Sequence, residues 1–313
     1  MGRFLQLLLA LAVTSGYVGA AFVYEGKWGS LGTGPGQFRE PWSVAVAPRT
    51  SYVYVADTYN RRLQCFTSSG SFLWKNNGDM LPGGVAASPD ARYLYFADAA
   101  NHCIWHLAPN GSLVGKWGRY GAGPGEFNQP WGCTVAPGTG YVYVCDRNNN
   151  RVQYFTSSGS FLGLWTAAFA WPIDVAVSPV SGYVYVSDQN NDLVKYFTSS
   201  GSFLGSWGGS GGGEGEFSHP GGVEVSRFGW VFVVDGGRNS RVQYFTATGS
   251  FLGKWGTVGS GNGQFMWPQG IALTADGLHV YVSECRNNRV QYFRDDGEAV
   301  EPASFGKVKA VFR

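Results

Sequence analysis

Charged residues are scarce in this chain. Asp, Glu, Lys and Arg together make up 14% of its 313 residues, and the formal net charge is only +2. A charge balance this close to neutral provides no general attraction to nucleic acids or to anionic membrane surfaces. We therefore expect no nucleic-acid partner.

Histidine and cysteine are also few. The chain has four histidines and five cysteines, and no two cysteines form a Cys-x-x-Cys pair. Zinc sites draw on several such ligands at short, regular spacings, so we predict no metal site and no cofactor. An odd number of cysteines leaves at least one unpaired in a monomer. We expect a monomer whose cysteines are mostly buried free thiols.

Long apolar runs are missing as well. The apolar run Phe4–Val13 follows Arg3 and precedes the small residues Val18-Gly19-Ala20. It is shorter than the roughly 20 residues that a membrane-spanning helix needs, and this order of features is typical of a secretory signal peptide. We predict a signal peptide over residues 1–20 with cleavage near Ala20. The mature chain, 21–313, is then secreted or extracellular, without stable membrane insertion.

Glycine and aromatic residues, by contrast, are abundant, and they recur in a repeat. An apolar run that ends in an acid is followed by a polar turn and then by a second apolar run, six times over. The six acids are Asp57, Asp98, Asp146, Asp188, Asp235 and Glu284. Their spacing of 41 to 49 residues is typical of solenoids, propellers and other repeat folds.

Each repeat contains four strand-like segments. In the third repeat these are Trp131–Ala136, Tyr141–Cys145, Arg151–Thr156 and Ser160–Trp165. Four antiparallel strands per repeat of this length form a propeller blade. We place the blades at about 38–78, 79–118, 127–166, 170–208, 217–256 and 265–294.

The last of these blades lacks a fourth strand. The segment 22–29 matches the fourth strands of the other blades. We therefore predict a single all-β domain over 21–313. It is a six-bladed β-propeller of four-stranded antiparallel blades, whose ring is closed by the N-terminal strand.

Two motifs resemble those of a known family. Residues 55–66, 144–155 and 282–293 follow the pattern Val-x-Asp/Glu-x-x-Asn-x-Arg-Val/Leu-Gln-x-Phe. Residues 32–41, 121–130, 211–220 and 259–268 follow Gly-x-Gly-x-Gly-Gln/Glu-Phe-x-x-Pro. Both resemble the NHL repeat, and the likeness covers nearly all of the mature chain. It implies a six-bladed propeller but leaves function open, because the family includes lyases, ligase-associated recognition domains and extracellular binding modules.

We interpret the six repeated acids as a structural ring. An acid at the end of a strand accepts hydrogen bonds from the following turn. It can also pair with the basic residue five or six positions on, which is Arg62, Arg151, Arg241 or Arg289 in four blades. Cys103 and Leu193 occupy this position in the other two blades. Asp98 and Asp188 are therefore expected to lack a local cation and to be available for another role.

The candidate binding site is a set of residues where the first strand of each blade begins. It comprises Arg39, Glu40, Trp42, Gln129, Trp131, Arg147, Trp171, His219, Trp267 and Gln269. We expect these to gather around one mouth of the central channel, where tryptophan beside polar and charged groups suits a peptide or a glycan. The alternative is that several of the tryptophans only fill the core between blades.

The function that follows is a secreted or cell-surface recognition module for an extracellular protein or glycan, with no catalytic residue. Its alternative is a propeller enzyme with a site at the channel mouth, resembling a divergent peptidylglycine α-amidating lyase or a metal-dependent hydrolase. That enzyme would use His219 and Glu40. A third reading is purely architectural, in which similar Thr-Ser-Ser-Gly-Ser-Phe-Leu turns reflect internal duplication.

Overall fold

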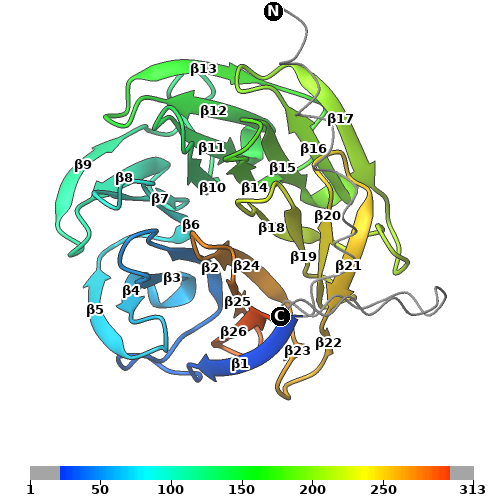
Figure 1. The fold of residues 1–313 in the computed structure, drawn as a ribbon. Coiled ribbons are helices and arrows are strands. Elements are labelled where there is room, and N and C mark those ends of the chain that lie inside the picture. Colours follow the sequence, from blue (N-terminus) through cyan, green and yellow to red (C-terminus); the bar gives the residue numbers. More distant parts are fainter. Residues whose placement is uncertain (1–21, 297–313) are drawn as a thin grey trace, which may run out of the picture.

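The computed structural model describes residues 22–296. The predicted signal peptide at 1–20 and the chain after residue 296 lie outside the described residues. Six four-stranded antiparallel sheets are arranged as a ring around a central channel (Figure 1). The predicted six-bladed β-propeller is confirmed.

Each blade runs from an inner strand at the channel to an outer strand at the rim. Blade 1 consists of β2 (Pro41–Val46), β3 (Val53–Asp57), β4 (Arg62–Phe66) and β5 (Phe72–Asn77). Blade 2 consists of β6 (Pro82–Ala87), β7 (Leu94–Asp98), β8 (Cys103–Leu107) and β9 (Leu113–Trp117). Blade 3 consists of β10 (Pro130–Val135), β11 (Val142–Asp146), β12 (Arg151–Phe155) and β13 (Phe161–Trp165).

The other three blades repeat this plan. Blade 4 consists of β14 (Pro172–Val177), β15 (Val184–Asp188), β16 (Leu193–Phe197) and β17 (Phe203–Gly208). Blade 5 consists of β18 (Pro220–Val225), β19 (Val231–Asp235), β20 (Arg241–Phe245) and β21 (Phe251–Trp255). Blade 6 consists of β24 (Pro268–Leu273), β25 (His279–Glu284), β26 (Arg289–Asp295) and β1 (Phe22–Trp28).

In the described part of the chain, helix is limited to single turns of 3-10 helix between the second and third strands of three blades. They are η1 (Thr58–Asn60), η2 (Arg147–Asn149) and η3 (Gln189–Asn191). The short strands β22 (Thr257–Val258) and β23 (Gln264–Phe265) pair in parallel within one glycine-rich connector. Within residues 22–296, no helix has the length and hydrophobicity that a membrane crossing requires.

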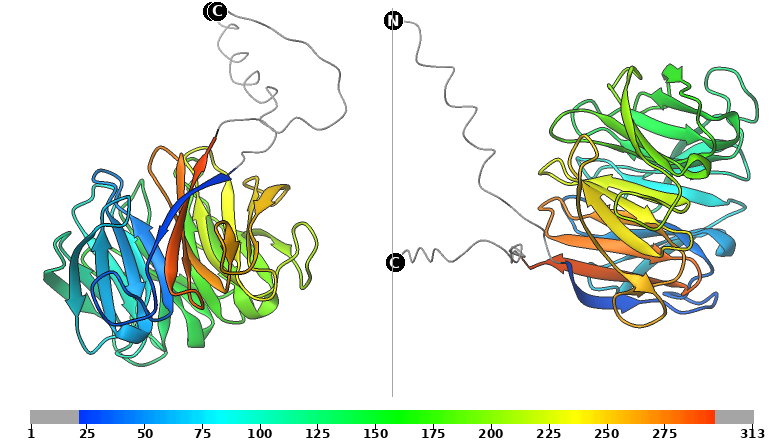
Figure 2. Two further views of the ribbon diagram at one scale, coloured as in Figure 1. Left: turned by 90° about the horizontal axis from the view of Figure 1, so that it is seen from below. Right: turned by 90° about the vertical axis from the view of Figure 1, so that its right-hand side faces the viewer.

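The ring is closed by the N-terminal strand, as predicted. β1 pairs antiparallel with β26, from Phe22 opposite Asp295 to Trp28 opposite Val290, and the two strands lie side by side in Figure 2. A bulge interrupts the pairing near Gly26, where a Cβ atom would lie 2.6 Å from the Tyr292 ring. Only glycine fits this contact. Closure covers the edge of β26 that would otherwise be unpaired at the rim of the last blade.

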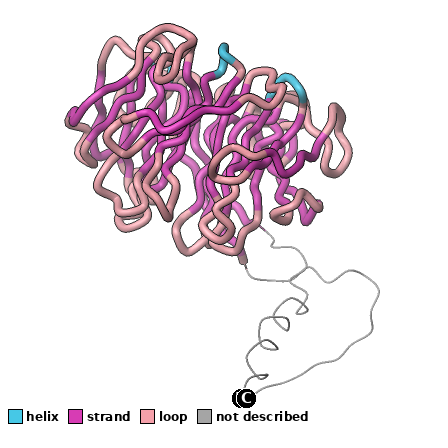
Figure 3. Tube along the Cα trace, turned by 90° about the horizontal axis from the view of Figure 1, so that it is seen from above, coloured by secondary structure: helices cyan, strands magenta, loops and turns pink. Residues whose placement is uncertain are grey.

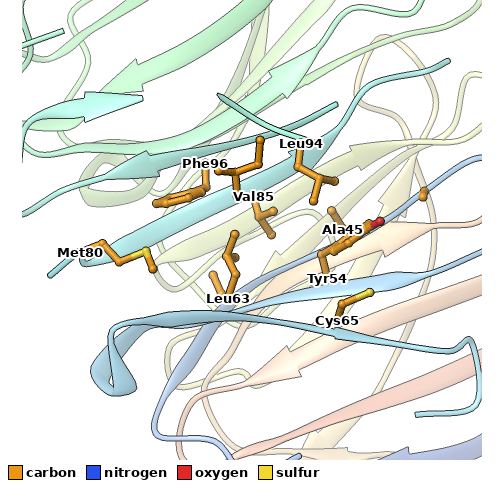
Figure 4. Close-up of a cluster of buried hydrophobic side chains, with 11 residues drawn as sticks. Ala45, Tyr54, Leu63, Cys65, Met80, Val85, Leu94 and Phe96 are labelled. Carbon is orange, nitrogen blue, oxygen red and sulfur yellow. The ribbon is translucent and has the colours of Figure 1, made fainter. Parts of the chain in front are cut away.

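The hydrophobic core lies between the blades rather than at one centre. Six clusters of buried side chains each join two neighbouring blades, including the pair formed by blades 6 and 1. Figure 4 shows one such cluster, in which Tyr54 and Leu63 of blade 1 face Val85 and Phe96 of blade 2. Since both faces of a blade are buried in this way, its middle strands are apolar nearly throughout.

The outer-strand tryptophans also join blades. The glycine in the turn between the third and fourth strands of one blade lies beneath the tryptophan of the preceding blade. A Cβ atom at Gly159 would lie 2.6 Å from the Trp117 ring, and Gly159 has a φ of +92°. The glycines of the repeated Gly-Ser-Phe-Leu turns are therefore packing elements.

The inner strands approach one another closely around the channel. Each begins with a proline, which has no N–H to leave unpaired at the start of a strand. A Cβ atom at Gly84 would lie 2.8 Å from Cα of Gly132 in the next blade. Glycine at these positions lets the six inner strands converge on a narrow channel.

Candidate functional site

The inner strands begin on the face of the ring that carries the turns between second and third strands, which we call the entrance face. Figure 3 shows the short helices of these turns, in cyan, on this face. The residue before the inner-strand proline has a left-handed backbone in five of six blades. These residues are Glu40, Gln129, Trp171, His219 and Trp267, with φ between 49° and 60°. This conformation costs about 1–2 kcal/mol per non-glycine residue.

Hydrogen bonds from the preceding blade hold this strained backbone in place. The N–H of Trp171 donates to Asn150 Oδ1 at 3.0 Å, and the N–H of Gln129 donates to His102 Nδ1 at 3.0 Å. His102 therefore makes a structural contact between blades 2 and 3. Equivalent bonds join Glu40 to Asn288 and His219 to Asp192. The side chains around the entrance are thus fixed by contacts between blades.

Five of the predicted site residues form one group on this face. The rings of Trp42 and Trp131 meet edge to face, with centroids 5.0 Å apart. The guanidinium carbon of Arg147 lies 4.2 Å from the Trp131 ring centroid and 5.0 Å from that of Trp171. Arg147 Nη2 donates to Gln129 Oε1. These residues come from blades 1, 3 and 4, so the cluster spans the channel entrance.

Arg147 lacks a counter-ion within the described chain. Burial lowers the pKa of its guanidinium to about 10, which leaves it protonated at neutral pH. Its Nε is buried, and neither a hydrogen-bond acceptor nor a carboxylate pairs with it in residues 22–296. Arg62, by contrast, donates through Nε to Asp57 Oδ2 at 2.7 Å. The cationic face of the cluster is therefore desolvated without being neutralised.

A second tryptophan–arginine pair lies on the same face. The guanidinium carbon of Arg286 is 5.2 Å from the ring centroid of Trp267. Trp267 is 45% exposed and Trp171 is 44% exposed, whereas Trp131 is 8% exposed. The predicted tryptophans therefore divide into two kinds. Trp171 and Trp267 present surface to a ligand, and Trp131 supports the arginine from below.

Beneath the tryptophans, the channel narrows to a small cavity. Trp42, Trp131, Ile173 and Gln269 contribute to its wall, and it holds about 20 Å³ of space for water. Gln269 is 4% exposed, and its Oε1 has no hydrogen-bond partner in the described chain. A space of this size suits one water molecule that bonds to such a group. The tryptophan pair thus nearly closes the channel at this depth.

Two carboxyl groups lie deeper in the channel. Asp174 on β14 accepts a hydrogen bond from the Val223 N–H at 3.1 Å, and Glu224 follows on the neighbouring strand β18. Both border a cavity with about 80 Å³ of space for water. Burial raises the pKa of Asp174 to about 8, with a further contribution from Glu224, and burial raises the pKa of Glu224 to about 7.

Three other predicted site residues do not join the arginine–tryptophan cluster through the contacts that the structure shows. Arg39, Glu40 and His219 are bonded through their backbone N–H groups, to Asp57, Asn288 and Asp192. Within residues 22–296, no group of three or more His, Cys, Asp and Glu side chains is arranged to hold a metal ion.

The six repeated acids are fully buried, and their side chains organise the turns. Asp57 accepts hydrogen bonds from the Arg39 N–H at 2.7 Å, from Asn60 Nδ2 at 2.9 Å and from Gln64 Nε2 at 3.0 Å, beside the Arg62 ion pair. Asp146, Asp235 and Glu284 have corresponding ion pairs with Arg151, Arg241 and Arg289. Burial raises the pKa of Asp57, and these bonds oppose that shift.

The expectation that Asp188 lacks a cation is wrong. Lys195 Nζ lies 2.7 Å from Asp188 Oδ2, and it also donates to the carbonyl oxygens of Ala167 and Ala168. Lys195 stands two positions beyond Leu193, and both side chains point toward the same face of the strand because residues i and i+2 do so. The basic residue two positions beyond Leu193 is the feature of the sequence that indicates this ion pair.

Asp98 is bonded in a different way. The Trp105 indole N–H donates to Asp98 Oδ2 at 2.9 Å, and Asn101 Nδ2 donates to it at 2.8 Å. Lys116 Nζ lies 3.7 Å from the Trp105 ring centroid. Asp98 therefore belongs to the turn network of its blade and is not available for another role.

The five cysteines are all buried free thiols. Cys133 lies opposite Val144 in the register of β10 and β11, and is therefore not paired with Cys145. Burial raises the pKa of the Cys65 thiol to about 12. Reactive cysteines have depressed pKa values and partial exposure, so this thiol has the properties of a packing residue.

Comparisons with known proteins agree with the geometry. Residues 127–155 and 265–293, in blades 3 and 6, match the family model of the NHL repeat. No curated protein matches the sequence. A structural genomics protein of unknown function from Bacteroides thetaiotaomicron VPI-5482 superposes with a TM-score of 0.69 and 16% identity, over 86% of this chain and 76% of that one.

A second solved structure is similar in fold. Kuenenia stuttgartiensis hydrazine synthase superposes with a TM-score of 0.61 and 11% identity, over 83% of this chain and 97% of that one. Identities this low establish the shared fold alone, since one fold hosts many functions. The chain is a six-bladed β-propeller in which segments of blades 3 and 6 match the NHL repeat.

Proposed function

We propose that this chain is a secreted or cell-surface recognition module that binds a protein or a glycan through its entrance face. One observation carries the proposal. Trp171 and Trp267, each about 45% exposed, stand at the entrance, and each lies beside an arginine. Tryptophan and arginine dominate the binding energy of protein interfaces.

The rigidity of this face supports a binding role. Trp171 and Trp267 have φ values of 60° and 52°, a conformation that bulky residues rarely adopt. Strained backbone of this kind is concentrated at functional sites, where it fixes a side chain for its task. A ligand that meets a preformed surface avoids the entropic cost of ordering it.

The test uses purified protein against a displayed library of random linear peptides and against an array of glycans. We expect the wild type to retain ligands and the double variant Trp171→Ala/Trp267→Ala to bind them at least tenfold more weakly. The matched control is Phe228→Ala. Phe228 is 54% exposed and also lies beside an arginine, Arg227 at 4.6 Å, but it belongs to the turn between β18 and β19 on the opposite face. Equal binding by the double variant and the wild type would refute the proposal.

A second candidate function is an enzyme with a site in the channel. The observation in its favour is that Asp174 and Glu224, whose pKa values are raised to about 8 and about 7, share the cavity with about 80 Å³ of space for water. Perturbed carboxyl groups in a cleft are typical of catalytic acids and bases. Metal analysis of the purified protein separates the two candidates, because about one tightly bound zinc or calcium ion per chain would favour the enzyme.

A further inference from the structure

We infer that Arg147 is a receptor for a carboxylate, and that the ligand of the entrance face is a peptide segment that carries this group. The inference rests on the proposed function and specifies the chemistry of its ligand. It starts from the contacts of Arg147, which differ from those of the arginines at the start of the third strands.

The first step is the missing counter-ion. Arg62, Arg151, Arg241 and Arg289 each pair with a buried acid, and Arg61, which also lies on the entrance face, pairs with Asp79 at 2.8 Å. Arg147 has no such partner within residues 22–296. A desolvated charge is unfavourable unless an opposite charge or hydrogen bonds compensate it. An anionic ligand supplies that compensation on binding, so the site favours anions over neutral groups.

The second step is the orientation of the guanidinium. Its two tryptophan neighbours, Trp131 and Trp171, contact the planar group at 4.2 Å and 5.0 Å from their ring centroids. Gln129 Oε1 accepts one N–H of Nη2. Stacking and this bond restrict rotation of the side chain and leave other N–H donors on its edge. A carboxylate matches such an edge with two parallel hydrogen bonds.

The third step separates a peptide from a sugar. Recognition of a sugar ring by tryptophan depends on a free indole face. Trp131 is only 8% exposed, and Arg147 already covers its ring. Trp171 also adjoins Arg147, and its remaining exposed surface is suited to an apolar side chain that neighbours the carboxylate. An acidic residue next to an apolar one, or a peptide C-terminus, has this combination of groups.

The test measures charge selectivity in the peptides that the display library yields. We expect the retained peptides to be enriched in Asp and Glu or to need a free C-terminus. Synthetic versions with Asn or Gln, or with an amidated C-terminus, identify which carboxylate binds. Arg147→Gln should weaken the binding of an acidic peptide at least tenfold and leave the binding of its neutralised version unchanged. Arg147→Lys should retain part of the affinity for the acidic peptide.

A stability measurement checks that Arg147 is a binding residue rather than a packing residue. The unfolding midpoint of Arg147→Met without ligand should equal or exceed that of the wild type, because an uncompensated cation is removed. Arg62→Met should lower the midpoint, since it leaves Asp57 buried without its cation.

The possible failures are distinguishable. Retention of neither peptides nor glycans refutes the proposed function and the carboxylate inference together, whereas retention of glycans alone overturns only the carboxylate inference. Peptides that lack acidic groups, or whose affinity is insensitive to Arg147→Gln, overturn the carboxylate inference alone. A lower midpoint for Arg147→Met than for the wild type also contradicts it, because the arginine would then stabilise the free protein.

Discussion

The substitution Asp174→Asn should stabilise this propeller at alkaline pH. Asp174 has a pKa of about 8 in the folded chain against 3.8 for an ordinary Asp, chiefly because the channel wall buries it. The folded state therefore holds a proton that the unfolded state has released between about pH 4 and pH 8. The contribution of Asp174 to stability therefore falls as pH rises through this range and is constant above it. Asn is isosteric with Asp and carries no charge, so the variant does not lose stability in this way as the pH rises.

The size of this stabilisation follows from the shift in the pKa of Asp174. One pKa unit corresponds to about 1.4 kcal/mol, so a shift of about 4 units sets a ceiling of about 6 kcal/mol. The cavity beside Asp174 has space for water, which stabilises part of the charge. We therefore expect Asp174→Asn to raise the free energy of unfolding by about 2–3 kcal/mol at pH 8.5 and by almost nothing at pH 4.

The assay is urea unfolding at several pH values between 4 and 8.5, followed by tryptophan fluorescence. The wild type and the variant should diverge progressively as pH rises. Buried acids that do not interact with Asp174, such as Asp57, contribute equally to both curves, so the difference reports Asp174 together with its interaction with Glu224. The control is Glu214→Gln, a surface acid whose side chain is 61% exposed and which should leave the pH dependence unchanged. Parallel curves for the wild type and Asp174→Asn would refute the reasoning.

Three further predictions concern the contacts that hold the ring together. Lys195→Met should destabilise the chain by about 3–5 kcal/mol, since it leaves Asp188 buried without its cation. The control is Lys254→Met, which removes a partly exposed lysine and should change the free energy of unfolding by less than about 1 kcal/mol in the same urea assay. Gly26→Val should lower the thermal midpoint because its side chain would overlap the Tyr292 ring, and an unchanged midpoint would show that β1 does not close the ring as described. The five cysteines should be unreactive toward a thiol reagent in the native protein and fully reactive in denaturant, and rapid native labelling would contradict their burial.

Much of the architecture was readable from the chain because it repeats. The six acids recur every 41 to 49 residues, and a single blade contains all the local signals for its own strands and turns. Ring closure was also predictable, since residues 22–29 match the fourth strand that the last blade lacks. Local periodicity and turn chemistry determine these features without reference to distant contacts.

Side-chain pairings were harder to predict from the sequence, because residues at more than one position can supply the partner of a repeated acid. Lys195 replaces the cation that Leu193 cannot supply, and Trp105 supplies a donor to Asp98 in the corresponding place. Both substitutions lie two residues beyond the expected position. Only the packing of adjacent strands shows that a longer side chain reaches the same acid.

The sequence by itself determined a closed ring of six blades, with tryptophans and arginines at the starts of the inner strands. Only the tertiary structure decided which of them meet. Arg147, Trp131 and Trp171 come together because blades 3 and 4 place an Asn-rich turn beside two inner-strand entrances. It also placed Asp174 and Glu224 in one channel, where burial raises both pKa values. Desolvation and the absence of a counter-ion depend on everything that surrounds a group, and no single segment of sequence contains that information.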